Sequence, residues 1–194
     1  MISMVMMRCQ EAIADALSKE NVKYVFGMPG GHNTAALYDA LNDHPEIKTV
    51  LVRHEEAASF MACVWHQLTG EPGICSATAG PGVAHLTAGI WEAYLGNYAL
   101  MAVNAVTAQK GMGMGLLQEV PQYEALKPVS KWSFRLERPD QAQWMMRRAF
   151  TIARSPPTGP VILHVPLDLG DVKTDYPDYK PSMVAIYRPS SDGI

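Results

Sequence analysis

The sequence predicts an α/β fold, a three-layer sandwich with a mostly parallel sheet of about six strands and helices on both faces. Short apolar runs alternate with longer stretches of helical periodicity, which is typical of such sheets. Glycine-rich turns follow three of the expected strands, and open α/β sheets bind ligands at this edge. With 194 residues, 48% of them hydrophobic, the chain is long enough to bury a core of its own as one domain.

The first half of the chain alternates expected helices with expected strands. The apolar run over 47–52 predicts a buried strand. Gly70 and Pro72 are expected to end the helix that follows this strand. The expected elements are a helix over 7–19, a strand over 22–26, a helix over 35–41, a strand over 47–52, a helix over 55–68, a strand from 73 and a helix through 86–94.

The second half is less regular. The run over 98–106 is apolar apart from Asn104, as in a strand covered on both faces. Glycines alternate with methionines over 109–117, which indicates either a mobile loop or the wall of a ligand pocket. We expect one domain over 1–170 and an extended tail or linker over 171–194, where prolines and tyrosines accumulate. The remaining expected elements are a helix over 122–126, a strand over 133–136, a helix over 140–153 and a strand over 161–165.

Composition and charge argue against several classes of protein. The net charge of −3 and the lack of a Lys or Arg block predict neither a nucleic-acid nor a membrane partner. The apolar stretch over 93–106 is too short to cross a bilayer and the first residues do not form a signal peptide, so we expect a cytoplasmic protein. The three cysteines, Cys9, Cys63 and Cys75, have no metal-ligand spacing, so we expect buried thiols and no metal site.

The stretch 52–58, V-R-H-E-E-A-A, places an acidic pair where a strand ends and a helix begins. A carboxylate at the carboxyl end of a strand lies where open α/β sheets bind ligands. The first turn of a helix also favours negative charge, so either Glu55 or Glu56 can be explained as an ordinary helix-start residue. Both interpretations apply to the acidic pair at this level.

Five motifs, in this order and spacing, make the chain resemble a known family over nearly its full length. It resembles the N-terminal pyrimidine-binding domain of thiamine diphosphate enzymes of the acetohydroxyacid synthase, pyruvate oxidase and benzaldehyde lyase group. Each motif is weak alone, and their order makes the resemblance specific. The motifs are F-G-M-P-G-G at 26–31, R-H-E at 53–55, T-A-G-P-G at 78–82, L-Q-E at 117–119 and G-P-V-I-L-H-V-P-L-D at 159–168.

The resemblance implies a catalytic role for Glu55. In the family this glutamate hydrogen-bonds a ring nitrogen of the cofactor's aminopyrimidine and favours the imino tautomer that removes the thiazolium proton. The cofactor then serves as the electron sink for chemistry beside a carbonyl group. The expected reaction is decarboxylation of a small 2-keto acid, or carboligation of the activated unit to a second carbonyl compound.

Two further residues are expected to be catalytic. His32 resembles in its spacing a histidine of benzaldehyde lyase, and it would move a proton at the substrate carbonyl or hydroxyl group. The alternative is an ordinary histidine near the start of a helix. Gln118 matches the family's active-site glutamine, which orients the substrate, and the alternative is a surface-loop glutamine.

The resemblance also implies contacts with the cofactor from the glycine turns. In this group an asparagine usually stands where the chain has His85, so this contact is either altered or adds an acid/base group. His54 is expected to be structural, because its neighbour Glu55 faces the ligand. Besides Glu55, the expected cofactor-binding residues are Pro29, Gly30, Thr78, Pro81, Gly82 and His85.

The family also uses a second domain, in which G-D-G and a downstream asparagine hold Mg²⁺ and the diphosphate. These motifs are not found in this sequence. We therefore expect thiamine diphosphate to be shared with a partner chain that carries the diphosphate-binding domain and Mg²⁺. The expected assembly is a hetero-oligomer, for example a heterotetramer, and a fragment of a larger enzyme is the alternative.

Two other functions compete with this hypothesis. A non-catalytic assembly or regulatory module derived from such an enzyme would need no carboxylate at Glu55. A nucleotide-binding α/β domain is also an alternative, but the turn P-G-G-H at 29–32 lacks the G-x-G-x-x-G pattern.

Overall fold

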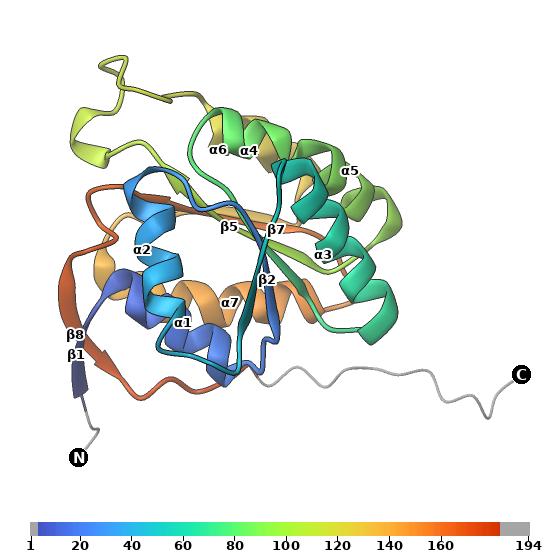
Figure 1. Ribbon diagram of the computed structural model, residues 1–194, viewed down its shortest axis with the longest axis horizontal. Helices are drawn as coiled ribbons and strands as arrows, with labels where there is room; N and C mark the ends of the chain where they lie inside the picture. The colour runs from blue at the N-terminus through green and yellow to red at the C-terminus, as the bar shows by residue number, and fades with distance from the viewer. Residues whose placement is uncertain (1–3, 183–194) are drawn as a thin grey trace, which may run out of the picture.

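A computed structural model describes residues 4–182, apart from the side chains of His32 and Asn33. Its centre is a six-stranded sheet in the order β3-β2-β4-β5-β7-β6, and every neighbouring pair of strands runs parallel. Helices cover both faces (Figure 1), which confirms the predicted fold class. The strands are β2 (Tyr24–Gly27), β3 (Lys48–Leu51), β4 (Gly73–Ser76), β5 (Leu100–Val106), β6 (Trp132–Arg135) and β7 (Val161–Pro166).

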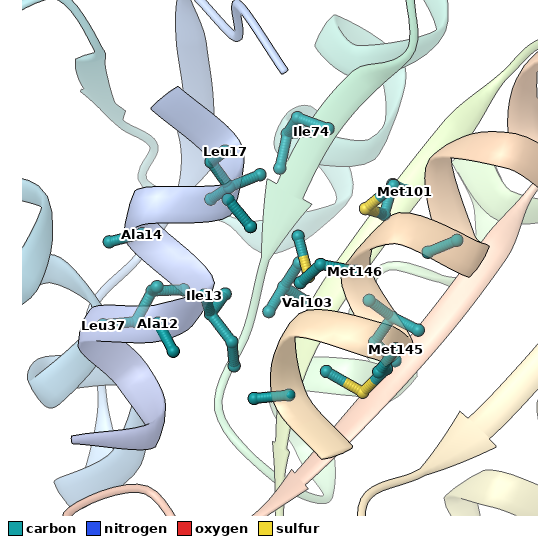
Figure 2. Close-up of a cluster of buried hydrophobic side chains, with 14 of the residues drawn as sticks. Ala12, Ile13, Ala14, Leu17, Leu37, Ile74, Met101, Val103, Met145 and Met146 are labelled. Atoms are coloured by element: carbon teal, nitrogen blue, oxygen red, sulfur yellow. The ribbon is translucent and has the colours of Figure 1, made fainter. Parts of the chain in front are cut away.

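One helical layer consists of α1 (Cys9–Lys19), α2 (Gly31–Leu41) and α7 (Ala142–Arg154). The buried face of α1 carries alanines together with Ile13 and Leu17, spaced along one side of the helix. Figure 2 shows these side chains meeting side chains of β4, β5 and α7 in a cluster without polar groups. Burial of this apolar surface stabilises the packing of the helices on the sheet.

The opposite layer consists of α3 (Glu55–Thr69), α4 (Pro81–His85), α5 (Thr87–Gly96) and α6 (Gln122–Leu126). Gly70 ends α3 in the left-handed conformation, with φ +75°, as predicted. Gly89 lets α5 approach α3 closely, because a Cβ there would lie 2.3 Å from the Ser59 hydroxyl oxygen. The helix predicted through 86–94 is confirmed as α5, and a separate short helix, α4, precedes it.

The strand expected over 47–52 is not buried, and this prediction is wrong. The observed strand, β3, is an edge strand that pairs with β2 on one side only. Its Leu51 is 71% exposed. The apolar run indicated a strand correctly, but its composition cannot distinguish an edge strand from a central one.

A second, two-stranded antiparallel sheet joins β1 (Met4–Arg8) to β8 (Lys173–Pro177). Neither strand was predicted. The start of the stretch 171–194 is therefore a strand packed on the domain, with Tyr176 buried, rather than a linker. The boundary at residue 170 stays a prediction, and residues 183–194 lie outside the described part of the chain.

The remaining connections are short or irregular. The three cysteines are free and buried, as expected. No helix among residues 4–182 is both long and apolar enough to cross a membrane. The short 3₁₀ helices are η1 (Gln109–Gly111), η2 (Lys127–Val129) and η3 (Pro139–Gln141).

Candidate functional site

The order of the strands creates a ligand-binding position beside β2. After β2 the chain adds β3 on one side of β2. It then crosses back and adds β4 on the other side of β2. Ligands bind open parallel sheets at such switch points, outside the carboxyl ends of the strands. The turns after β2, β3 and β4 contain the motifs F-G-M-P-G-G, R-H-E and T-A-G-P-G, so the sheet brings them to one edge.

Glu55 is the first residue of α3 and is buried. His54 caps the helix, because its Nδ1 accepts a hydrogen bond from the Glu56 backbone N–H at 3.3 Å. The two acidic residues differ in burial: the Glu55 side chain is 8% exposed and the Glu56 side chain is 51% exposed. Glu56 behaves as a solvated helix-start residue, while Glu55 points into the protein.

A histidine pair holds the Glu55 carboxylate from one side. His85 Nδ1 lies 2.9 Å from Glu55 Oε2, and this contact joins the end of α4 to the start of α3. The ring of His54 stacks on the ring of His85 with centroids 4.4 Å apart. His54 therefore has the structural role that was expected, as a helix cap and as a support for the His85 ring.

Glycines pack closely against Thr78 and the other side of the carboxylate. A Cβ added to Gly82 would lie 3.2 Å from Glu55 Oε1 and 2.8 Å from the Thr78 methyl carbon Cγ2. A Cβ added to Gly31 would lie 2.8 Å from Thr78 Oγ1, and one added to Gly30 would lie 3.5 Å from Thr78 Cβ. Thr78 thus lies between the turn after β2 and the start of α4. Close packing therefore requires glycine at Gly31 and Gly82, where a Cβ would come within 2.8 Å of Thr78.

Gln118 lies against the turn between β4 and α4. Its backbone has φ +62°, and its carbonyl oxygen would lie 2.8 Å from a Cβ added to Gly80. Gly80 has φ +65°, so both steric space and backbone conformation require glycine there. The structure therefore brings the L-Q-E segment beside T-A-G-P-G, although the two are far apart in the sequence.

The other predicted residues are placed less fully. Pro81 is the exposed first residue of α4, and Pro29 is exposed in the turn after β2. His32 lies in the first turn of α2, but its side chain is outside the described part of the structure. Of the methionine-rich loop, Met112 and Gly113 line a groove of about 320 Å³ together with Glu119 and residues of α6, and Gln118 does not line it.

Three buried polar residues near the site were not predicted. Asn104 accepts a hydrogen bond from the Ala77 N–H, and Gln122 accepts one from the Gly80 N–H. His164 contacts Gln122 in turn. The sequence carried a faint signal for two of them, because Asn104 interrupts an apolar run and His164 lies within a quoted motif.

These features define the class of protein. A parallel α/β domain with a buried carboxylate at the switch point, held on one side by a histidine, has the architecture of domains that bind ligands at the carboxyl ends of their strands. Residues 7–126 match the family described as thiamine pyrophosphate enzyme, N-terminal TPP binding domain. The chain belongs to this family.

Similar proteins have related descriptions. The chain is 33% identical over 187 residues to an acetolactate synthase of Arthrospira platensis, covering 94% of this chain and 32% of that protein. It is 35% identical over 189 residues to a probable acetolactate synthase large subunit of Methanocaldococcus jannaschii, covering 92% and 32%. It is 33% identical over 192 residues to the acetolactate synthase isozyme 3 large subunit of Escherichia coli, covering 98% and 33%. The chain thus spans about a third of the length of these relatives.

Proposed function

We propose that this chain forms the pyrimidine-binding half of the active site in a thiamine diphosphate-dependent enzyme that resembles acetolactate synthase. The enzyme would decarboxylate a small 2-keto acid, or join the resulting unit to a second carbonyl compound. The observation that carries the proposal is the Glu55 carboxylate, which is buried, bonded to His85 through Oε2 and left without a hydrogen-bond donor at Oε1 by the described residues.

The residues present fit the cofactor's aminopyrimidine. The ring carries nitrogen atoms at its edge that need a hydrogen-bonding group, and Glu55 Oε1, which has no donor among the described residues, can provide it. Gly30, Thr78 and Gly82 would line the ring, with Pro29 and Pro81 at the outer ends of the two turns. Thiamine diphosphate, when bound, supplies the electron sink for bond cleavage or formation beside a carbonyl group.

Each side chain of the site then has a defined task. Glu55 would share a proton with a ring nitrogen through its open oxygen. His85 would hold the carboxylate in place by donating from Nδ1, a bond that the 2.9 Å contact supports. His32 and Gln118 are proposed to act on the substrate, His32 by moving a proton and Gln118 by orienting the carbonyl group.

We further propose that a partner chain holds the diphosphate and Mg²⁺. An exposed apolar face on α3 and α5 supports this, because α3 begins with Glu55 and carries exposed apolar residues from its second turn to its far end. Contiguous exposed apolar surface usually marks a protein interface. A partner that covers this face would lie next to the site. The exposed residues are Phe60, Met61, Val64 and Leu68 of α3, and Trp91, Tyr94 and Leu95 of α5.

Native mass spectrometry of the chain purified from its own source tests the proposal, together with an assay for thiamine diphosphate in the same sample. We expect a complex with a second chain that contains G-D-G, and about one cofactor for each copy of this chain. A homo-oligomer without cofactor would contradict the catalytic proposal. That outcome would favour a non-catalytic assembly module, which would also bind a protein partner through the apolar face.

A further inference from the structure

The turn 77–80 is held in place by side chains from outside it. The Ala77 N–H donates to Asn104 Oδ1 of β5 at 3.1 Å, and the Gly80 N–H donates to Gln122 Oε1 of α6 at 3.0 Å. Both bonds are buried. Because buried backbone N–H groups are costly to leave unpaired, these two amide oxygens determine how the turn lies on the sheet.

The orientation of the Gln122 amide follows from its neighbours. Its nitrogen Nε2 lies 2.9 Å from the Ala105 carbonyl oxygen and 2.9 Å from His164 Nδ1. A carbonyl oxygen can only accept a hydrogen bond, so the atom facing Ala105 is the amide nitrogen. The amide oxygen must then face Gly80, and His164 Nδ1 must accept the second N–H.

His164 is therefore neutral, with its proton on Nε2. That nitrogen lies 3.2 Å from the Ser133 hydroxyl oxygen, which can accept the bond. His164, Gln122 and Ser133 are all buried. Burial lowers the pKa of His164 to about 4, with a smaller contribution from the positive charge of Arg135, which agrees with the neutral ring. One tautomer and one amide orientation satisfy every contact in this network.

We propose that Gln122, oriented by neutral His164, is a positioning residue for the cofactor site, because it sets the conformation of the turn that carries Thr78 and Gly82 toward Glu55. The role rests on the proposed function. The chain of contacts runs from His164 through Gln122 to Gly80, and from that turn to the Gly82 backbone beside Glu55 Oε1. Gln122 acts only through the turn.

Two variants of Gln122 and one control test this role. Gln122→Met removes both the acceptor and the donors at nearly constant size. Gln122→Asn keeps the amide but shortens the side chain by one methylene group, so that it no longer reaches Gly80. This variant allows the test to be made if Gln122→Met does not fold. Ser133→Ala is the matched control, since it removes a bond to His164 at the end of the network that is remote from the turn.

The first readout is hydrogen exchange of the Gly80 amide, measured by NMR on the isotope-labelled full chain. We expect exchange at least tenfold faster in both Gln122 variants than in Ser133→Ala, after correction for each variant's global stability. Equal corrected rates in all three variants would overturn the proposal, because the network would then be ordinary core packing.

The second readout is made on the assembled enzyme. We expect Gln122→Met to raise the apparent dissociation constant of thiamine diphosphate at least tenfold, with kcat at saturating cofactor within about threefold of wild type. Unchanged cofactor affinity would also overturn the proposal. If the wild-type enzyme does not bind thiamine diphosphate, the proposed function fails, whereas the Gly80 exchange rates still decide whether Gln122 positions the turn.

Discussion

Glu20 and Glu55 are both buried at helix ends, but their oxygens are used differently. Glu20 follows α1, and its carboxylate accepts four hydrogen bonds from Arg154, Tyr179 and Ser182 at 2.5–3.0 Å. Glu55 begins α3, and its side-chain partner within the described part of the chain is His85 alone. One carboxylate is enclosed by donors, and the other is held on one side.

The difference shows what separates a structural carboxylate from one that can serve a ligand. Burial alone does not, because both residues are buried. A buried charge is tolerated when its oxygens are paired, and Arg154 with its neighbours does this for Glu20. At Glu55 the described residues supply a donor to Oε2 and none to Oε1. That incomplete pairing leaves a hydrogen bond for a ligand to make.

The largest effect is expected at Glu55. Glu55→Gln should lower the activity of the assembled enzyme by about 10²–10⁴-fold, since proton transfer through a positioned carboxyl group contributes about this much. Stability should change little, because an amide of the same size can still pair with His85. Steady-state kinetics together with thermal unfolding measure both quantities.

The neighbouring carboxylate provides the control for this prediction. Glu56→Gln alters an exposed side chain at the same helix start and should leave turnover within about twofold of wild type. An equal loss of turnover in the two variants would mean that activity depends on negative charge at the start of α3 and that the unpaired oxygen of Glu55 has no specific role.

Glu20→Gln should have the opposite profile. The amide nitrogen cannot accept hydrogen bonds, so Arg154 is left partly unpaired in a buried position. We expect the free energy of unfolding to fall by about 3 kcal/mol, as when a buried ion pair is broken. Urea denaturation measures this change, and kcat of the folded enzyme should stay near the wild-type value.

Glu71 supplies the matched control at this ion pair. Its carboxylate also contacts Arg154, at 3.2 Å, but it is partly exposed. Glu71→Gln should therefore cost less than about 1 kcal/mol. An equal loss of unfolding free energy in Glu71→Gln and Glu20→Gln would show that the burial of Glu20 does not increase its contribution to stability.

A smaller effect is expected at His85, the residue that holds Glu55. His85→Ala removes the donor at 2.9 Å and should lower activity about tenfold, as expected for a lost hydrogen bond to a charged group. His85→Asn keeps an N–H donor and should stay within about threefold of wild type. If asparagine is as harmful as alanine, the imidazole ring does more than hold the carboxylate, and this outcome would favour an acid/base role.

The sequence predicted those parts of the molecule that depend on local patterns. Helical and strand periodicity are read within about ten residues, so the three layers and most elements were predictable. The position of the site at one edge was predictable because glycine turns follow strands, and parallel strands bring their carboxyl ends together. The choice of Glu55, Thr78, Gly82 and Gln118 as site residues came from the resemblance, and the placement of Gln118 beside Gly80 was not predicted.

The features that were missed depend on contacts between distant residues. The pairing of β1 with β8 joins the two ends of the domain, and no local pattern marks it. The bond from Gly80 to Gln122 spans 42 residues. A lone polar residue in an apolar stretch, such as His164, indicates a buried partner, but the partner becomes known only when the layers are assembled.

The smallest effect extends the comparison to a buried group that is fully paired and neutral. The pKa of His164 is lowered from 6.5 to about 4, mainly by burial. Below pH 6.5 the unfolded chain binds a proton at this residue that the folded chain does not bind until about pH 4. The free energy of unfolding therefore falls as the pH is lowered through this window, and the full contribution of His164 is present above it. Between pH 7.5 and pH 5.5 the loss should be about 1 kcal/mol.

Urea denaturation at the two pH values, compared with His164→Gln, isolates this contribution, because glutamine does not titrate and the other groups cancel in the difference. An identical pH dependence in the variant would mean that His164 takes up its second proton at the same pH in the folded and unfolded chains, which contradicts a folded ring whose Nδ1 accepts the bond from Gln122.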